Sequence, residues 1–207
     1  MRRASRLVHV CGWTGAVLLC ALVACAPALN WREVRPAQTD GLQATFPCKP
    51  DAVERRLVLP GLPEPVVLHM LSCQADGGMW ALSHLTVTDA AQVPVALRAL
   101  AAATRGNVEA ATRVATRQAG AALRASELPP VAVPGMTPQP DSRAWRFEAV
   151  RPGDGAGPGV PMAVTAWHFS HGLTVFQASV WQQGEGTTAH SGREAVTTFL
   201  QGFHFPG

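Results

Sequence analysis

The first 25 residues limit which part of the chain can fold as a domain. They begin with three arginines, continue as an apolar run and end in Leu22-Val23-Ala24-Cys25. A basic start, an apolar middle and a small residue before a cleavage site are the marks of a secretory signal. A cysteine directly after that site is typical of a bacterial lipoprotein signal. We therefore expect residues 1–24 to be removed and Cys25 to carry lipid, so that the rest of the chain folds at a membrane surface.

Two other interpretations of this segment stay open. Cys11 and Cys20 each follow a large apolar residue, whereas Cys25 follows an alanine, which fits the peptidase. An uncleaved transmembrane anchor over residues 7–29 would be barely long enough to span a bilayer, and a histidine and two glycines interrupt it. An ordinary soluble signal with a chance cysteine is the second alternative. The lipoprotein signal explains the most features and is our prediction.

The residue after Cys25 indicates which membrane holds the protein, and the length of the remaining chain indicates its domain organisation. Aspartate at this position holds lipoproteins at the inner membrane of enteric bacteria, and this chain has Ala26 instead. The resemblance implies an outer-membrane lipoprotein that faces the periplasm. We expect residues 25–30 to form a lipidated tether and residues 31–207 to form a single domain, which is long enough for a hydrophobic core.

The charge balance argues against a nucleic-acid partner. The formal charge of +3 comes from 17 basic and 14 acidic residues, but three of the basic residues lie in the expected signal. The mature chain is therefore close to neutral and lacks the basic excess that nucleic-acid binding needs. The expected partners are the membrane, through the lipid, and an envelope protein or polymer.

After cleavage, the cysteines besides Cys25 are Cys48 and Cys73. Two thiols in an oxidising compartment predict one disulfide, with the two strands that carry them side by side. Two buried free thiols are one alternative. A catalytic pair of Cys73 with His69, four residues before it, is the other.

The hydrophobic pattern changes period along the chain, which predicts both strands and helices. Alternation and β-branched runs predict strands, with hairpins around Pro60-Gly61 and Ser170-His171-Gly172. Helical spacing after Asp89, an N-cap candidate, predicts a helix that ends or kinks at Gly106. The expected strands are 31–35, 42–48, 55–59, 66–73, 79–88, 145–150, 160–169 and 173–181; the expected helices are 90–104, 108–123 and 189–200, with an extended loop over 126–142.

This order of elements predicts an α+β fold, in which two to three helices pack on a mostly antiparallel sheet. The chain resembles a family of small proteobacterial lipoproteins for which no activity is known. The likeness rests on NWREVR (30–35), FPCKP (46–50), LSC (71–73), VPGMTPQP (133–140) and VFQASV (175–180). The early F-x-x-P strand, long hairpins and interleaved helices also resemble the PsbP-like α/β/α sandwich. That resemblance implies a protein that binds or assembles other proteins and is not an enzyme.

The sequence predicts no catalytic, cofactor-binding or metal-binding residues. His168 and His171 are three apart, and residues three apart on a strand face opposite sides, so these two cannot share a metal unless His171 turns back in the hairpin. Neither Ser170 nor Ser191 sits in a G-x-S-x-G turn. We expect a non-catalytic protein- or envelope-binding module, with a periplasmic hydrolase or thiol enzyme, or a small-ligand carrier, as alternatives.

Tryptophans are the candidates for a recognition surface, because tryptophan is enriched in binding hot spots. Most of them should be core, since the chain has no tyrosine. Trp80 and Trp167 lie out of phase with aliphatic neighbours on their expected strands. We therefore expect these two to include any exposed aromatic contact.

Overall fold

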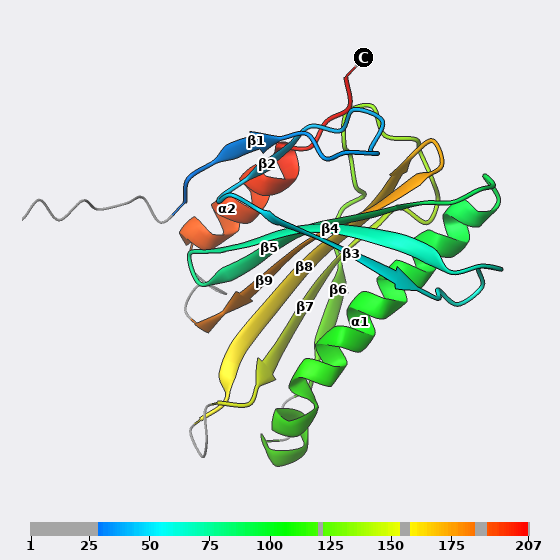
Figure 1. The fold of residues 1–207 in the computed structure, drawn as a ribbon. Coiled ribbons are helices and arrows are strands. Elements are labelled where there is room, and N and C mark those ends of the chain that lie inside the picture. The colour runs from blue at the N-terminus through cyan, green and yellow to red at the C-terminus, as the bar shows by residue number, and fades with distance from the viewer. Residues whose placement is uncertain (1–28, 120–121, 154–157, 185–189, 207) are drawn as a thin grey trace, which may run out of the picture.

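The computed structural model describes residues 29–119, 122–153, 158–184 and 190–206. Cys25 and the expected signal lie outside the described residues. The core is a seven-stranded antiparallel sheet in the order β3-β4-β5-β9-β8-β7-β6, accompanied by a two-stranded β1-β2 sheet and two helices (Figure 1). The elements are β1 (Arg32–Val34), β2 (Ala44–Phe46), β3 (Asp51–Leu57), β4 (Val66–Ala75), β5 (Gly78–Thr86), α1 (Gln92–Ala119), β6 (Arg124–Glu127), β7 (Arg143–Arg151), β8 (Val160–His171), β9 (Thr174–Gln183) and α2 (His190–Gln201).

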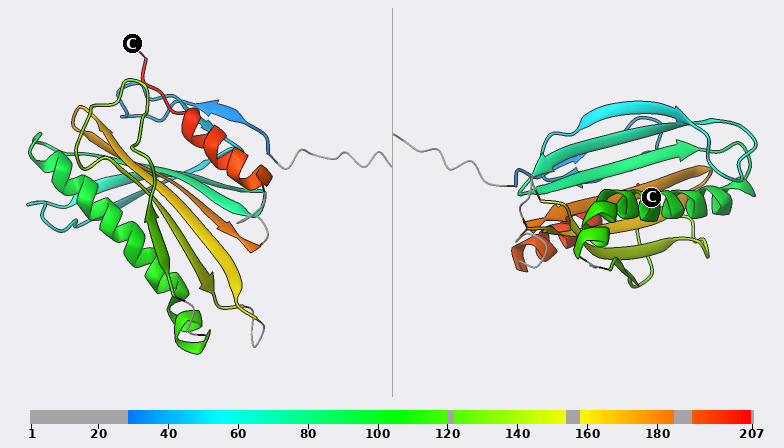
Figure 2. Two further views of the ribbon diagram at one scale, coloured as in Figure 1. Left: turned by 180° about the vertical axis from the view of Figure 1, so that it is seen from behind. Right: turned by 90° about the horizontal axis from the view of Figure 1, so that it is seen from below.

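The two helices cover opposite faces of the sheet. Strand side chains alternate, so Trp80 and Leu82 on β5 point to the face where Phe199 of α2 packs. Leu85 lies three residues after Leu82, so its side chain points to the other face of the sheet, where it packs with Leu97 of α1. The views in Figure 2 show α1 running diagonally across the sheet, with α2 and the β1-β2 pair on the other side. The expected α+β class is confirmed.

The region 90–123 differs from the prediction of two helices. Gln92–Ala119 is a single helix of 28 residues that continues through Gly106. A helix-interior glycine costs about 1 kcal/mol relative to alanine. Packing beyond it offsets that cost, because Val108 is fully buried against Phe147 and Val164.

Both predicted hairpins are confirmed. β3 pairs with β4, and β8 pairs with β9 around the turn at Gly172. The sequence reading missed β6, which falls partly in the predicted extended loop. All four β6 residues are exposed at the sheet edge, so the strand has no buried face to leave an alternating pattern.

The disulfide between Cys48 and Cys73 is present, with Cα atoms 6.0 Å apart. The expectation that it joins neighbouring strands of one sheet was wrong. Cys73 lies within β4, but Cys48 lies just after β2, which pairs with β1 alone. The bridge therefore ties the β1-β2 pair to the main sheet.

The described residues contain no helix that is both long and apolar enough to cross a membrane.

Candidate functional site

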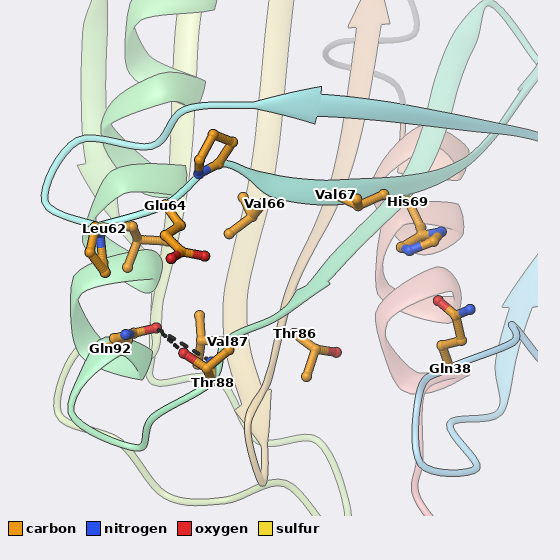
Figure 3. Close-up of a pocket in the computed structure, with 12 residues that line it drawn as sticks. Gln38, Leu62, Glu64, Val66, Val67, His69, Thr86, Val87, Thr88 and Gln92 are labelled. Atoms are coloured by element: carbon orange, nitrogen blue, oxygen red, sulfur yellow. Dashed lines mark hydrogen bonds between the residues drawn. The ribbon is translucent and has the colours of Figure 1, made fainter.

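A pocket of about 470 Å³ opens at the end of the sheet where β4 begins and β5 ends (Figure 3). Four segments far apart in the sequence build it: the loop before β2, the β3–β4 connection with the first half of β4, the end of β5, and the first residue of α1. Its lining residues are Gln38, Leu62, Pro63, Glu64, Pro65, Val66, Val67, His69, Thr86, Val87, Thr88 and Gln92.

The loop before β2 brings Gln38 to the pocket in a demanding backbone conformation. Gln38 and Asp40 have φ values of 59° and 52°, which non-glycine residues rarely adopt. Side-chain hydrogen bonds hold this loop: the Thr39 hydroxyl donates to the Pro36 carbonyl at 2.7 Å. Asp40 accepts a hydrogen bond from the Thr174 hydroxyl at 3.3 Å, and that hydroxyl lies 3.1 Å from the hydroxyl of Thr86.

The β3–β4 connection presents Glu64 from an anchored loop. Leu59 and Leu62 are buried against α1. Gly61 has a φ of +85°, and a Cβ there would lie only 2.8 Å from Cγ1 of Val95. Glycine is needed at this position both for its backbone angle and for the close approach to the helix. Glu64 then sits between two prolines, which restrict its backbone further.

The start of α1 supplies the last wall. The Asp89 carboxylate accepts the backbone N–H of Ala91 at 2.7 Å, as an N-cap. The amide oxygen of Gln92 accepts from both the backbone N–H and the hydroxyl of Thr88, at 3.4 Å each. The predicted cap at Asp89 is thereby confirmed, and Gln92 is held beside the pocket (Figure 3).

A row of side chains extends across the sheet from the pocket wall. Nδ1 of His69 lies 3.1 Å from the Glu54 carboxylate, within ion-pair distance. The rings of His69 and His84 stack with centroids 4.9 Å apart, and His84 then abuts Phe176. Burial, and secondarily the neighbouring His69, lower the pKa of His84 to about 4. His84 is therefore neutral at neutral pH and serves as a packing residue there.

The arrangement around His69 can be compared with that of an acyl-transfer centre. An acyl-transfer centre needs a nucleophile beside a base that a third group orients. Glu54 orients His69, but within the described chain no hydroxyl or thiol is hydrogen-bonded to His69. The Thr86 and Thr88 hydroxyls bond to Thr174 and Gln92 instead. The alternative pairing of His69 with a Cys73 thiolate is excluded, because Cys73 is in the disulfide.

His168 and His171, which the sequence raised as possible metal ligands, lie in different environments. His168 is fully buried beneath α1, with its Nε2 atom 3.4 Å from the Thr104 hydroxyl. His171, in the β8–β9 turn, stacks on Phe205 and donates from Nδ1 to the Gly135 carbonyl at 2.7 Å. No cluster of three or more potential metal ligands occurs in the described parts of the chain.

The expectation of an exposed aromatic surface at Trp80 or Trp167 was wrong. Trp80 is 2% exposed and Trp167 is 4% exposed. Both point to the face that α2, the β1-β2 pair and the segment after β6 cover; Trp80 packs edge-on against Trp31 and Phe199. The two tryptophans are out of phase with aliphatic residues such as Leu85 because they point to the other face of the sheet. That face is also covered by a hydrophobic core and not by solvent.

Trp167 also forms part of a second concavity. An open, apolar groove of about 370 Å³ lies between α2 and residues 128–131. The polar residues around it are Thr165 on β8 and Arg193, Thr197 and Gln201 on α2. The pocket at the β4–β5 end is larger and is built by four separate segments, so it is the stronger candidate site.

Sequence reasoning missed the pocket as a site. Of the residues that line the pocket, the sequence singled out His69 alone, as the possible partner of Cys73 in a catalytic pair. Comparison with known proteins adds no candidate: no family model matches the chain, and no curated protein matches it significantly in sequence.

Proposed function

We propose that the chain is an outer-membrane-anchored periplasmic lipoprotein whose domain is a non-catalytic binding module. In this proposal Cys25 carries the lipid, residues 25–30 are the tether, and the domain is a PsbP-like α/β/α sandwich. A sheet with one helix on each face supports that architecture. The module would bind or help assemble an envelope protein or polymer.

The observation that carries the proposal is the composition of the pocket. Apolar walls from Leu62, Val66 and Val87 surround a few polar groups delivered by separate elements. Ligand sites have this character, with volumes of about 300–1,000 Å³. No described hydroxyl or thiol is hydrogen-bonded to His69 to act as a nucleophile, which favours binding over catalysis.

The position of the pocket suits an anchored protein. The described chain begins beside Trp80, where Trp31 packs with ring centroids 6.2 Å apart. Thr86, on the pocket wall, is six residues further along β5, or about 20 Å away. The six residue steps from Cys25 to Trp31 span at most about 21 Å when fully extended. The lipid would thus hold one end of the sheet near the membrane and leave the pocket at the end that points away from it.

Two experiments test this proposal. For the anchor, cells are labelled with a clickable palmitate analogue. Wild type should label and Cys25→Ala should not; a variant that still labels would refute lipidation at Cys25.

For the binding module, a photoreactive p-benzoylphenylalanine replaces Val67, which lines the pocket, or Val53, which lies on β3 outside it. Each valine is 41% exposed, so the two sites are matched in accessibility. Crosslinking in intact cells from position 67 but not from 53 supports the proposal. Equal crosslinking, or none, contradicts it.

One observation favours the alternative of a periplasmic hydrolase. The Glu54 carboxylate lies 3.1 Å from Nδ1 of His69, and a carboxylate beside an imidazole is a common feature of general-base catalysis. If that alternative holds, purified protein hydrolyses chromogenic esters and His69→Ala abolishes the activity while circular dichroism stays unchanged.

A further inference from the structure

The charges of the pocket are one-sided. Glu64 is the acidic residue that lines it, and no arginine or lysine is among its lining residues. Glu64 forms no ion pair or hydrogen bond with the described chain. Two further carboxylates lie close to residues that line the pocket. Glu54 contacts the lining residue His69, and Asp40 contacts Thr174, which in turn contacts the lining residue Thr86. The nearest register position with a basic residue on this face is Arg56, opposite Val67, and Arg56 is exposed and does not line the pocket.

The charged acceptor of the pocket is the carboxylate of Glu64, whereas the glutamine amides and threonine hydroxyls around it carry both donors and acceptors. Glu64 offers two carboxylate oxygens, and Gln38 offers an amide oxygen from the opposite side. A primary ammonium group carries three donors and no acceptor, so it matches such a set. A quaternary ammonium group is recognised by aromatic faces instead, and none of the lining residues is a phenylalanine, tryptophan or tyrosine.

The apolar part of the pocket defines the rest of the ligand. Val87 is 3% exposed and Leu62 is 9% exposed, and Val66 continues the same wall. These side chains form an apolar surface next to the carboxylate. A flexible alkyl chain that ends in an ammonium group would contact both at once.

We propose that this pocket binds an aminoalkyl group, a primary ammonium on a short alkyl chain, with Glu64 as its counter-ion. A free diamine and a lysine side chain of an envelope protein share this chemistry. The inference rests on the proposed binding function and names the ligand class of the same site.

The test uses the full mature domain and 1,5-diaminopentane as the probe, followed by NMR chemical-shift perturbation. The expected shifts fall on the backbone amides of Leu62, Glu64, Val66 and Val67 and of residues 86–92. n-Pentanol lacks the charge and pentanoate reverses it, so both should bind more weakly than the diamine. Glu64→Gln should weaken diamine binding about fivefold, which is the scale of one partly exposed ion pair.

Asp51→Asn is the matched control, because Asp51 is an exposed carboxylate on β3 outside the pocket. It should bind the diamine as wild type does. Equal weakening by Asp51→Asn and Glu64→Gln would overturn the proposal, since it would report general charge attraction. Absence of saturable shifts up to about 10 mM diamine, a very weak affinity, would also overturn it.

A second arm distinguishes the sources of the group. Nα-acetyl-lysine amide should bind more tightly than the diamine if the natural group is a lysine side chain, and less tightly if it is a free diamine; either order supports the proposal. Crosslinking from position 67 without diamine binding would reject the amine and keep the binding module. Loss of both would reject the two together.

Discussion

Mild acid should destabilise the folded domain through His168. The ring is fully buried on the face that α1 covers, next to Thr104 and Gln177. Burial lowers the pKa of His168 from 6.5 to about 4, because the charged ring would lose its hydration there. The folded state therefore binds fewer protons than the unfolded state between these two values. Stability is full above about pH 6.5 and is lost as the pH falls toward 4.

The size of the effect follows from linkage. With an unfolded pKa of 6.5 and a folded pKa of about 4, His168 lowers the free energy of unfolding by about 2 kcal/mol between pH 7 and pH 5. The loss reaches about 3 kcal/mol once the pH is below 4. This is a substantial part of the 5–15 kcal/mol that is typical of folded domains.

The assay is urea unfolding at pH 7, 6 and 5, followed by tryptophan fluorescence, on wild type and His168→Gln. Glutamine does not titrate, so the variant should lose about 2 kcal/mol less than wild type between pH 7 and pH 5. Its stability at pH 7 can differ, but only the change with pH matters. Phe169→Leu, which disturbs the neighbouring residue on β8 but keeps the imidazole, should retain the wild-type pH dependence.

The reasoning is refuted if His168→Gln and wild type lose the same free energy between pH 7 and pH 5. It is also refuted if Phe169→Leu flattens the pH dependence as strongly as His168→Gln does. Either result would assign the acid sensitivity to other groups or to general loosening of the core.

Three more predictions concern stability and packing. Replacing Cys48 and Cys73 by serine should lower the free energy of unfolding by about 3.5 kcal/mol, the chain-entropy value for the 25-residue separation; denaturant melts of the oxidised wild type and the double variant measure it. Gly61→Ala should cost about 2 kcal/mol, because alanine is disfavoured at φ +85° and its Cβ would press on Val95. Gly77→Ala has a positive φ of 66° without such a clash and should cost less, so equal losses in thermal melts would contradict the steric part. Trp80→Ala should cost about 3–5 kcal/mol, as for a buried aromatic residue, and a loss below 1 kcal/mol would restore the idea that Trp80 is a surface residue.

The sequence predicted those parts of the fold that depend on local pattern. The hairpin between β8 and β9 and the cap at Asp89 follow from a few neighbouring residues, and the structure has both. The disulfide followed from cysteine count and compartment. The helix break at Gly106 failed because the packing of Val108, a tertiary contact, decides whether the helix continues.

The site was not predictable in the same way. Gln38, Glu64 and Gln92 line one pocket although they are far apart in the sequence. They do so because the loop before β2, the β3–β4 connection and the start of α1 all lie at one end of the sheet. None of the three has a local pattern that distinguishes it from an ordinary surface residue. Glu54 and His69 are likewise brought together by the register of β3 on β4, which the sequence does not state.

The layered architecture explains why the pocket lies at a strand end. Each face of the central strands is taken by a helix and its apolar contacts, so Trp80 and Leu85 on β5 are both buried although they point opposite ways. Toward the end of β5 the side chains remain near loops and a helix start, where backbone turns can present polar groups over an apolar wall. Gln38 and Glu64 reach the pocket from such loops. A tryptophan in mid-strand is therefore available for packing in this fold, whereas a carboxylate on the β3–β4 connection is available for a ligand.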